Sequence, residues 1–249
     1  MSLRWFASTR GSVPDSKRRR WFAASCLPVP LGLFLAVAFT TLPSPDAYSL
    51  QVRFSTVDVR AGLLWLGNTA LPSGGQGAPS PLLNDIGVSV PLGLGPRFSI
   101  MPEVDFFAFQ YQLATNGTQV VPTEIEYANS VELVTVMVDL AARYEIPINK
   151  TMSWGLIAAP VFLLRIPTQA WGTGVDNIGT ITGYFYNAGR FFYPELGSFL
   201  YVQILPRIGL ELRVRSFFPI FHLWDGEGDP FYDQMMVDAT LGFCFAVGK

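Results

Sequence analysis

Beyond Ser49, apolar and polar residues alternate along several segments of the chain with a period of two. The clearest segment covers residues 237–247, with the sequence VDATLGFCFAV. One face carries Val237, Ala239, Leu241, Phe243, Phe245 and Val247, and the other carries Asp238, Thr240, Gly242, Cys244 and Ala246. Successive side chains of a β-strand point to opposite faces, so this segment is predicted to be a strand with one apolar face.

Seven further segments complete the predicted set of strands. Five of them alternate in the same way, at residues 57–65, 84–92, 98–106, 136–146 and 208–215. Two others, at about 152–166 and 193–205, are more uniformly apolar and contain Pro160 and Pro194. We assign these two as strands because the topology needs them, which gives an antiparallel arrangement of eight strands.

The length of these segments separates a membrane protein from a soluble sandwich. A strand in a soluble domain usually has about 5 to 6 residues. Most of the segments here extend over about 10 or more residues, which is the length that a tilted strand needs to cross a bilayer. Length therefore favours membrane-spanning strands.

Long and short connections alternate between the predicted strands. The long connections are residues 68–81, 114–130, 168–192 and 222–230, and the short ones are residues 93–96, 147–151 and 205–207. Outer-membrane barrels have long loops on the outside and short turns in the periplasm. The sequence therefore predicts an eight-stranded antiparallel transmembrane β-barrel in the outer membrane of a diderm bacterium, with both chain ends in the periplasm.

Closure of the barrel assigns a direction to each face. In lipid every backbone N–H and C=O group needs a protein partner, which only a closed sheet supplies, so the polar face turns inward. The expected lumen residues are Asp58, Arg60, Asp85, Arg97, Glu103, Asp105, Asp139, Arg143, Glu145, Glu211, Arg213, Arg215 and Asp238. We interpret them as a structural salt-bridge network, with an ion path as the alternative. Eight strands leave a lumen that side chains can fill.

The N-terminal 49 residues are expected to form a leader and signal peptide, and residues 50–249 the barrel. Four basic residues at 17–20 precede an apolar stretch at 21–42, and small residues follow at Ala47 and Ser49. This order of a charged, an apolar and a small-residue region is typical of a secretory signal. An uncleaved membrane anchor is the alternative, although Pro28 and Pro30 weaken a helix there.

Composition narrows the chemistry. The chain is 50% hydrophobic and 14% charged, with a formal net charge of -2 and only two cysteines. It contains no P-loop, dinucleotide-binding glycine pattern, paired zinc ligands or nucleophile elbow, so we predict no enzyme activity, no cofactor, no metal site and no nucleic-acid partner. His222 is the single histidine, and we interpret it as an interfacial residue rather than as a catalytic base.

The layout from about Leu50 to Lys249 resembles the small eight-stranded outer-membrane proteins, the class of OmpX, OmpW and the OmpA membrane domain. Strand phrases such as FSIMPEVDFF after a tight turn are similar to this class, and Val59-Arg60-Ala61-Gly62 resembles the first strand of OmpW-type proteins. The OmpW resemblance implies a narrow channel or a binding site for small hydrophobic molecules.

Three functional hypotheses follow. The first is that channel, with a pocket at the barrel mouth formed by Ile178, Ile181, Tyr184, Phe185, Tyr186, Phe191 and Phe192. The second is a packed barrel with a structural or surface-display role, such as adhesion. The third is a soluble lipocalin-type barrel with an apolar interior. The expected partners are outer-membrane lipid, the barrel-insertion machinery and, for the channel, small hydrophobic solutes.

Overall fold

A computed structural model describes residues 53–54, 56–69, 80–114, 117–123 and 129–247 of the chain. The predicted leader lies outside the described residues. Among those residues, no helix combines the length and the apolar character that a membrane-spanning helix requires.

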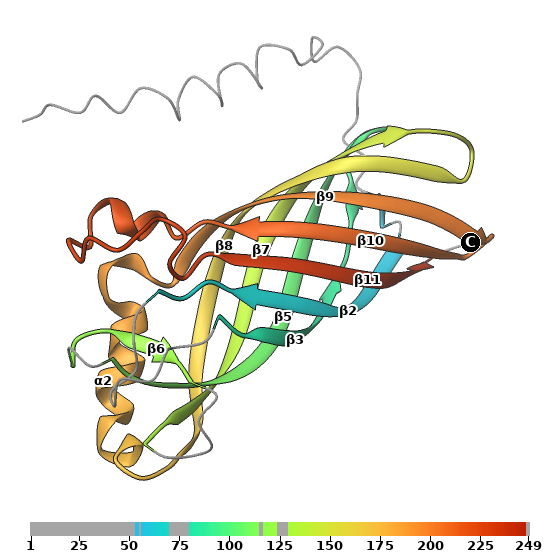
Figure 1. Ribbon diagram of the computed structural model, residues 1–249. Helices are drawn as coiled ribbons and strands as arrows, with labels where there is room; N and C mark the ends of the chain where they lie inside the picture. Colours follow the sequence, from blue (N-terminus) through green and yellow to red (C-terminus); the bar gives the residue numbers. More distant parts are fainter. Residues whose placement is uncertain (1–52, 55, 70–79, 115–116, 124–128, 248–249) are drawn as a thin grey trace, which may run out of the picture. The chain divides into compact units, whose positions relative to one another are not determined.

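Eight long strands form a closed antiparallel ring, as the sequence predicted (Figure 1). They are β2 (Thr56–Leu66), β3 (Leu82–Ser89), β5 (Phe98–Leu113), β7 (Val131–Pro147), β8 (Met152–Ala170), β9 (Phe192–Leu205), β10 (Ile208–Phe217) and β11 (Met236–Ala246). Neighbours in sequence pair with each other, and the pairing of β11 with β2 closes the ring. Every backbone ladder thus finds a partner within the barrel, as a bilayer requires.

Three short strands extend this ring. β1 (Arg53–Phe54) pairs with β4 (Leu92–Gly93), and β6 (Val120–Pro122) pairs with the far end of β5. β4 continues the line of β3, because both pair with β5 on either side of a break at residues 90–91. The backbone N–H of Val90 donates to Pro102 O at 3.1 Å across this break, which preserves the ladder.

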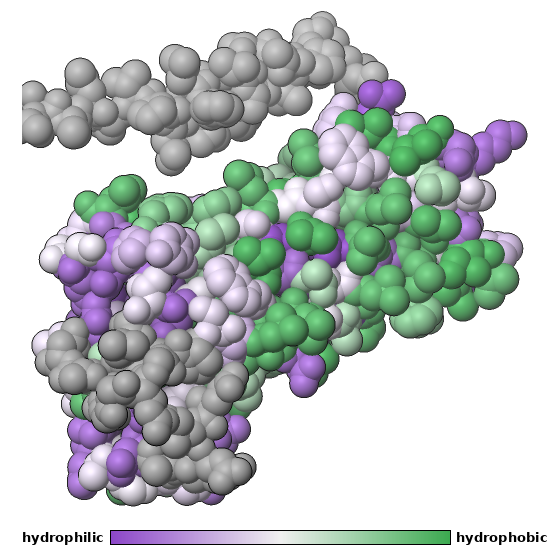
Figure 2. Space-filling view, in the orientation of Figure 1, coloured by the Kyte–Doolittle hydropathy of each residue, from purple (hydrophilic) through white to green (hydrophobic). Residues whose placement is uncertain are grey.

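The two faces of the barrel differ in the way the alternation predicts. On β10, Arg213 is 2% exposed whereas its neighbours Leu212 and Val214 are 50% and 47% exposed. On the face shown in Figure 2, the exterior of the strands is largely apolar, and hydrophilic residues are more frequent at the end that carries α2. A soluble barrel would show the opposite arrangement, so the lipocalin hypothesis is wrong and the membrane-type barrel is confirmed.

The connections at the two ends of the barrel differ in length. Short turns at 94–97, 148–151 and 206–207 lie at one end, which we call the turn end, together with the last residues of β11 (Figure 1). The opposite end, which we call the loop end, carries the long connections. There α2 (Gly174–Tyr186), the 3-10 turn η1 (Asn187–Gly189) and η2 (Ile220–Leu223) interrupt the loops.

The prediction that residues 168–192 form a loop is wrong for most of this segment. β8 continues to Ala170, and most of the remainder is the helix α2. Ile178, Ile181 and Phe185 recur at spacings of three and four, which places them on one helical face against β5, β7 and β8. This helical period was present in the sequence, but the residues were interpreted as an apolar loop.

Candidate functional site: the lumen and its two ends

The centre of the lumen is occupied by two arginines of β10. Arg213 and Arg215 are two residues apart, so both point inward, and both are almost completely buried. The carboxylates that meet them come from other strands around the ring. The barrel thus brings residues more than 100 positions apart in the sequence into contact.

Arg215 has the largest set of acidic neighbours. Its guanidinium forms ion pairs with Glu103 and Asp238, and a further one with Asp105 at 2.9 Å. Asp85 and Glu195 lie farther away, at 3.6 and 3.9 Å. This buried arginine is tightly held, because its carboxylate partners are also shielded from water and separation would leave uncompensated charges in the interior.

Arg213 and Arg60 extend the network toward both sides. Arg213 pairs with Glu103 at 2.6 Å and with Glu211 at 2.5 Å. Arg60 pairs with Glu103 at 2.5 Å and also contacts Asp105. Glu103 therefore links three arginines across the lumen, and these side chains fill its cross-section.

Nearer the turn end, Arg143 continues the network. It binds Glu211 at 2.6 Å, and its guanidinium carbon lies 3.6 Å from the ring centre of Phe199. Glu145 is a weaker partner at 3.9 Å, and its side chain is 42% exposed at the rim. We call these contacts, together with those of Arg60, Arg213 and Arg215, the lumen network.

Buried acids outnumber buried arginines in this part of the barrel. The buried acids of the strands are Asp58, Asp85, Glu103, Asp105, Asp139, Glu195, Glu211 and Asp238. The arginines of the lumen network are Arg60, Arg143, Arg213 and Arg215. Within the described residues, Asp58 and Asp139 form no ion pair, and no hydrogen bond of normal geometry reaches their carboxylate oxygens. The lumen is therefore locally acidic.

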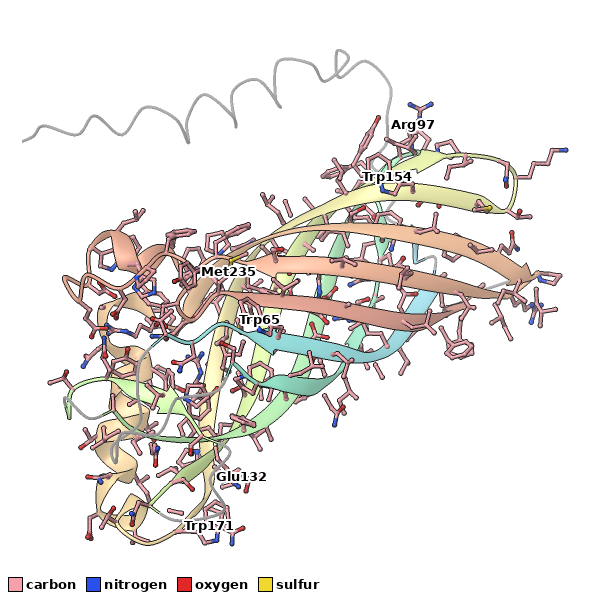
Figure 3. All side chains as sticks on the ribbon, in the orientation of Figure 1. Trp65, Arg97, Glu132, Trp154, Trp171 and Met235 are labelled. Carbon is pink, nitrogen blue, oxygen red and sulfur yellow. The ribbon has the colours of Figure 1, made fainter. Side chains whose placement is uncertain are left out.

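Arg97 is placed differently from the prediction. It is exposed at the turn between β4 and β5, and Figure 3 shows it at the turn end of the barrel. Among the described residues it forms no ion pair, whereas its backbone carbonyl accepts from the N–H of Glu145 at 2.8 Å. The alternation was extended one step too far into the turn, where side chains no longer alternate between two faces.

Two buried charges of the long strands were missed. Glu195 and Arg165 lie on the inner faces of β9 and β8, the two strands that were assigned from uniformly apolar sequence. A single charge inside an apolar strand is costly unless it faces the interior, and this signal was available in the sequence.

The loop end is closed by aromatic side chains from the helix and the strands. Phe185 of α2 contacts Tyr111 with a ring distance of 5.0 Å, and Arg165 lies 4.0 Å from the centre of the Phe185 ring. Tyr193 meets Phe221 at 5.6 Å. Tyr111, which would suit an outer aromatic girdle from its position, is thus buried inside.

The seven residues of the predicted mouth pocket lie in different surroundings. Ile181, Tyr184 and Phe185 are buried in the contact between α2 and the barrel, and Ile178 packs beside them. Tyr186 is 43% exposed, and Phe191 is half-buried. Phe192 belongs to β9 and meets the outward-facing Phe162 at a ring distance of 5.2 Å.

A second cluster of charges surrounds the C-terminal end of α2. Arg190 pairs with Glu227 at 2.6 Å and with Asp225 at 3.4 Å, and it lies 4.2 Å from the ring centre of Tyr184. His222 contacts Asp225 through Nδ1 and the Asp233 carbonyl oxygen through Nε2, each at 2.9 Å. Both ring nitrogens are engaged, which suits a structural role that orders the loops.

A cavity bounded by the described residues lies at the turn end. It has a volume of about 300 Å³. Exposed residues of the β4–β5 turn, Pro96 and Arg97, form its rim, and Asp58, Glu211 and Cys244 form its floor. We call it the turn-end cavity.

Comparison with solved structures gives several similar chains. No family model and no curated protein matches the chain. Neisserial surface protein A (NspA) is 10% identical, covers 77% of this chain and 96% of its own, and has a TM-score of 0.44. Ail, the attachment invasion locus protein of Yersinia pestis, is 6% identical, covers 78% and 100%, and has a TM-score of 0.41.

A third neighbour is the N-terminal β-barrel domain of OprF from Pseudomonas aeruginosa. It is 9% identical, covers 78% of this chain and 98% of its own, and has a TM-score of 0.36. The closed antiparallel ring of eight strands agrees with the predicted resemblance to small outer-membrane barrels, whereas the narrower likeness to OmpW-type proteins stays a prediction.

Proposed function

We propose that this protein is an outer-membrane β-barrel with a packed, non-conducting lumen, whose loop end is an ordered contact surface outside the cell. Its apolar outer face fits outer-membrane lipid as the surrounding partner. A barrel of this kind reaches the membrane through the barrel-insertion machinery, with both chain ends in the periplasm.

The lumen network is the observation that carries the proposal. Glu103 bridges Arg60, Arg213 and Arg215, and these four side chains have at most 3% of their surface exposed. A continuous water-filled path would require these buried ion pairs to separate. Breaking such a pair leaves an uncompensated charge in a low dielectric, which costs several kcal/mol.

The alternative of a channel for small hydrophobic molecules loses its main support. That hypothesis followed from the OmpW resemblance, and its support in the sequence was the set of apolar residues predicted at the mouth. In the folded chain, the side chains of Ile181 and Phe185 are buried by packing against the barrel. They form a cap over the lumen, which favours the packed barrel.

The loop end offers exposed side chains for recognition. Leu223, Trp224, Phe231 and Tyr232 follow β10 and are between 45% and 75% exposed. The Trp224 Nε1–H donates to Ala188 O at 2.7 Å, which ties this segment to the connection after α2. Exposed aromatic residues on an ordered support are typical of contact sites.

Conductance in planar bilayers tests the packed lumen. The purified protein is expected to give no resolved single-channel steps. The double substitution Arg213→Ala with Arg215→Ala is expected to produce leakage, because it removes two side chains that fill the centre. The matched control, Leu212→Ala with Val214→Ala, changes the outer face of the same strand and should stay silent. Regular steps from the unaltered protein would refute the proposal.

Labelling of intact cells tests the orientation. A cysteine in place of the exposed Thr180 on α2 should react with a membrane-impermeant maleimide, and one in place of the exposed Lys150 at a turn should react only after lysis. Both are made with Cys26→Ser and Cys244→Ser. The reverse pattern would place the turns outside the cell and overturn the assignment.

A further inference from the structure

The turn-end cavity holds a cluster of potential metal ligands that no motif in the sequence indicates. Asp58, Glu211 and Cys244 each offer one ligand atom, and these atoms lie within 4.8 Å of one another. All three residues are buried inside the barrel. They come from three consecutive strands of the ring, β2, β10 and β11.

The register of these strands builds the cluster. Cys244 is the direct partner of Asp58 across the β11–β2 ladder. Glu211 pairs with Gly242 on the other side of β11, two residues from Cys244 on the same inward face. The pairing partner of Cys244 on β10 is Gly209, so no side chain on that strand separates the thiol from the cavity. The three ligands therefore converge because of strand pairing alone.

Asp58 is the second observation that points to a bound cation. Its side chain is 2% exposed and forms no ion pair, and its two carboxylate oxygens form no hydrogen bond of normal geometry among the described residues, with Thr56 and the cluster's own Cys244 as the polar side chains beside it. A buried carboxylate normally accepts hydrogen bonds or pairs with a cation. Asp58 instead faces the turn-end cavity, which has room for a metal ion and its water ligands.

Charge matching favours a divalent ion. Glu211 is already paired with Arg143 and Arg213, so its charge is balanced within the lumen network. Asp58 and a Cys244 thiolate together supply the two negative charges that a divalent ion needs. Glu211 keeps free lone pairs and can serve as the third ligand without leaving its arginines.

The mixture of a thiolate and carboxylates selects the kind of ion. Thiolate is a soft ligand that favours Zn²⁺ over Mg²⁺ or Ca²⁺. Tetrahedral Zn²⁺ holds its ligand atoms about 3.5 Å apart, so side-chain rotations that move these atoms by about 1 Å would complete the site. We propose that Asp58, Glu211 and Cys244 form a binding site for Zn²⁺ or a similar soft divalent cation, reached from the turn end of the barrel.

The binding step is an exchange of a proton for the metal. The Cys244 S–H bond breaks, its proton passes to water in the turn-end cavity, and the sulfur electron pair forms the bond to the metal. No oxidant or reductant is involved. The fourth position of the ion remains for water, because the cavity continues toward the rim at Arg97.

Cobalt absorption tests this site directly. The full chain with Cys26→Ser has Cys244 as its single thiol. Co²⁺ added to this protein in detergent should give a thiolate-to-cobalt charge-transfer band, and the band should saturate at one Co²⁺ ion per chain. Cys244→Ser should abolish the band. Asp58→Asn should weaken Co²⁺ binding by at least about tenfold, since even outer-shell changes cost 10- to 100-fold. Zn²⁺ should displace Co²⁺.

The control variant is Asp139→Asn. Asp139 belongs to another group of buried carboxylates, with Glu103 and Glu195, which contains no sulfur. It should leave the thiolate band unchanged. Absence of the band in the folded protein, or a band that Asp58→Asn does not weaken, would overturn the proposal.

Thiol protection gives a second readout that needs no variant in the site. In the folded protein with Cys26→Ser, Zn²⁺ should slow the reaction of Cys244 with a small maleimide at least about tenfold, and EDTA should restore it. An unchanged rate would contradict the site, even if Asp58→Asn or Cys244→Ser fails to fold.

Discussion

Two buried arginines of this barrel, Arg215 in the lumen network and Arg165 under the cap, differ in their partners. In the lumen network, Arg215 is surrounded by carboxylates from four strands. Under the cap formed by α2, Arg165 faces the Phe185 ring and donates to the backbone carbonyl of Arg190 at 3.2 Å. Arg215 is held by opposite charges between strands, whereas Arg165 is held by an aromatic contact with the helix and a backbone contact with the connection that follows it. Barrel and cap should therefore respond separately to substitution.

The largest effect is expected for Arg215→Ala. It leaves Glu103, Asp105 and Asp238 without their shared cation in the interior, which costs about 3–5 kcal/mol of unfolding free energy. Urea titration in detergent measures this loss of unfolding free energy, and the fractions of folded and unfolded protein are read from their different migration on an unheated gel. Arg97→Ala removes the same group at the exposed turn and should cost less than about 0.5 kcal/mol. Equal losses for both variants would contradict the inward network.

The next effect is expected for Phe185→Ala in the cap. This ring is 2% exposed, and its removal should cost about 3 kcal/mol, confined to α2 and the adjoining loops. Hydrogen exchange should accelerate for the α2 amides while the strand amides keep their protection. Val175→Ala changes a residue of the same helix that is 57% exposed, and it should alter the exchange of neither the α2 amides nor the strand amides. Uniform loss of protection in the strands would show that cap and barrel unfold together.

A smaller effect is expected for Tyr184→Phe. Burial raises the pKa of the Tyr184 phenol well above its usual range, so the group stays neutral and accepts from Gln234 Nε2 at 3.0 Å. Removing the hydroxyl should destabilise the cap by about 1 kcal/mol. Exchange rates of the α2 amides measure it, with Tyr232→Phe as an exposed control. No difference between the two variants would mean that the hydrogen bond contributes nothing.

The smallest effect is expected for Gly179→Ala in α2. A methyl group at this position meets no atom within 4 Å, and alanine should stabilise the helix by about 0.5–1 kcal/mol. Slower exchange of the α2 amides would show this gain. Gly62→Ala is the contrast, because its Cβ would lie 2.2 Å from Ala239 O of the neighbouring strand. A loss of stability from Gly179→Ala would argue against a helix exposed on this side.

The alternation in the sequence was sufficient for the barrel and for most of its inner face. Residues such as Asp238 and Arg213 could be assigned because a strand has only two faces and a bilayer accepts only one of them. Glu195 and Arg165 were missed because their strands are apolar on both faces, so the sequence does not show which alternate residues point into the lumen. Arg97 was misplaced because alternation stops at a turn.

Contacts between distant elements could not be predicted in this way. The cap depends on how α2 packs on β5, β7 and β8, which a helical period alone does not specify. The grouping of Asp58, Glu211 and Cys244 depends on the register of three strands, and a shift of two residues in one ladder would separate them. Alternation fixes a face, whereas register fixes neighbours.

Quenching by brominated lipids most directly tests the claim that the apolar face meets lipid while the charges fill the lumen. A fluorophore is attached to Leu241→Cys on the outer face of β11, with Cys26→Ser and Cys244→Ser, and compared with one at Thr180→Cys on α2. We expect strong quenching at position 241 and none at position 180. Equal fluorescence at position 241 in brominated and ordinary lipid would contradict it.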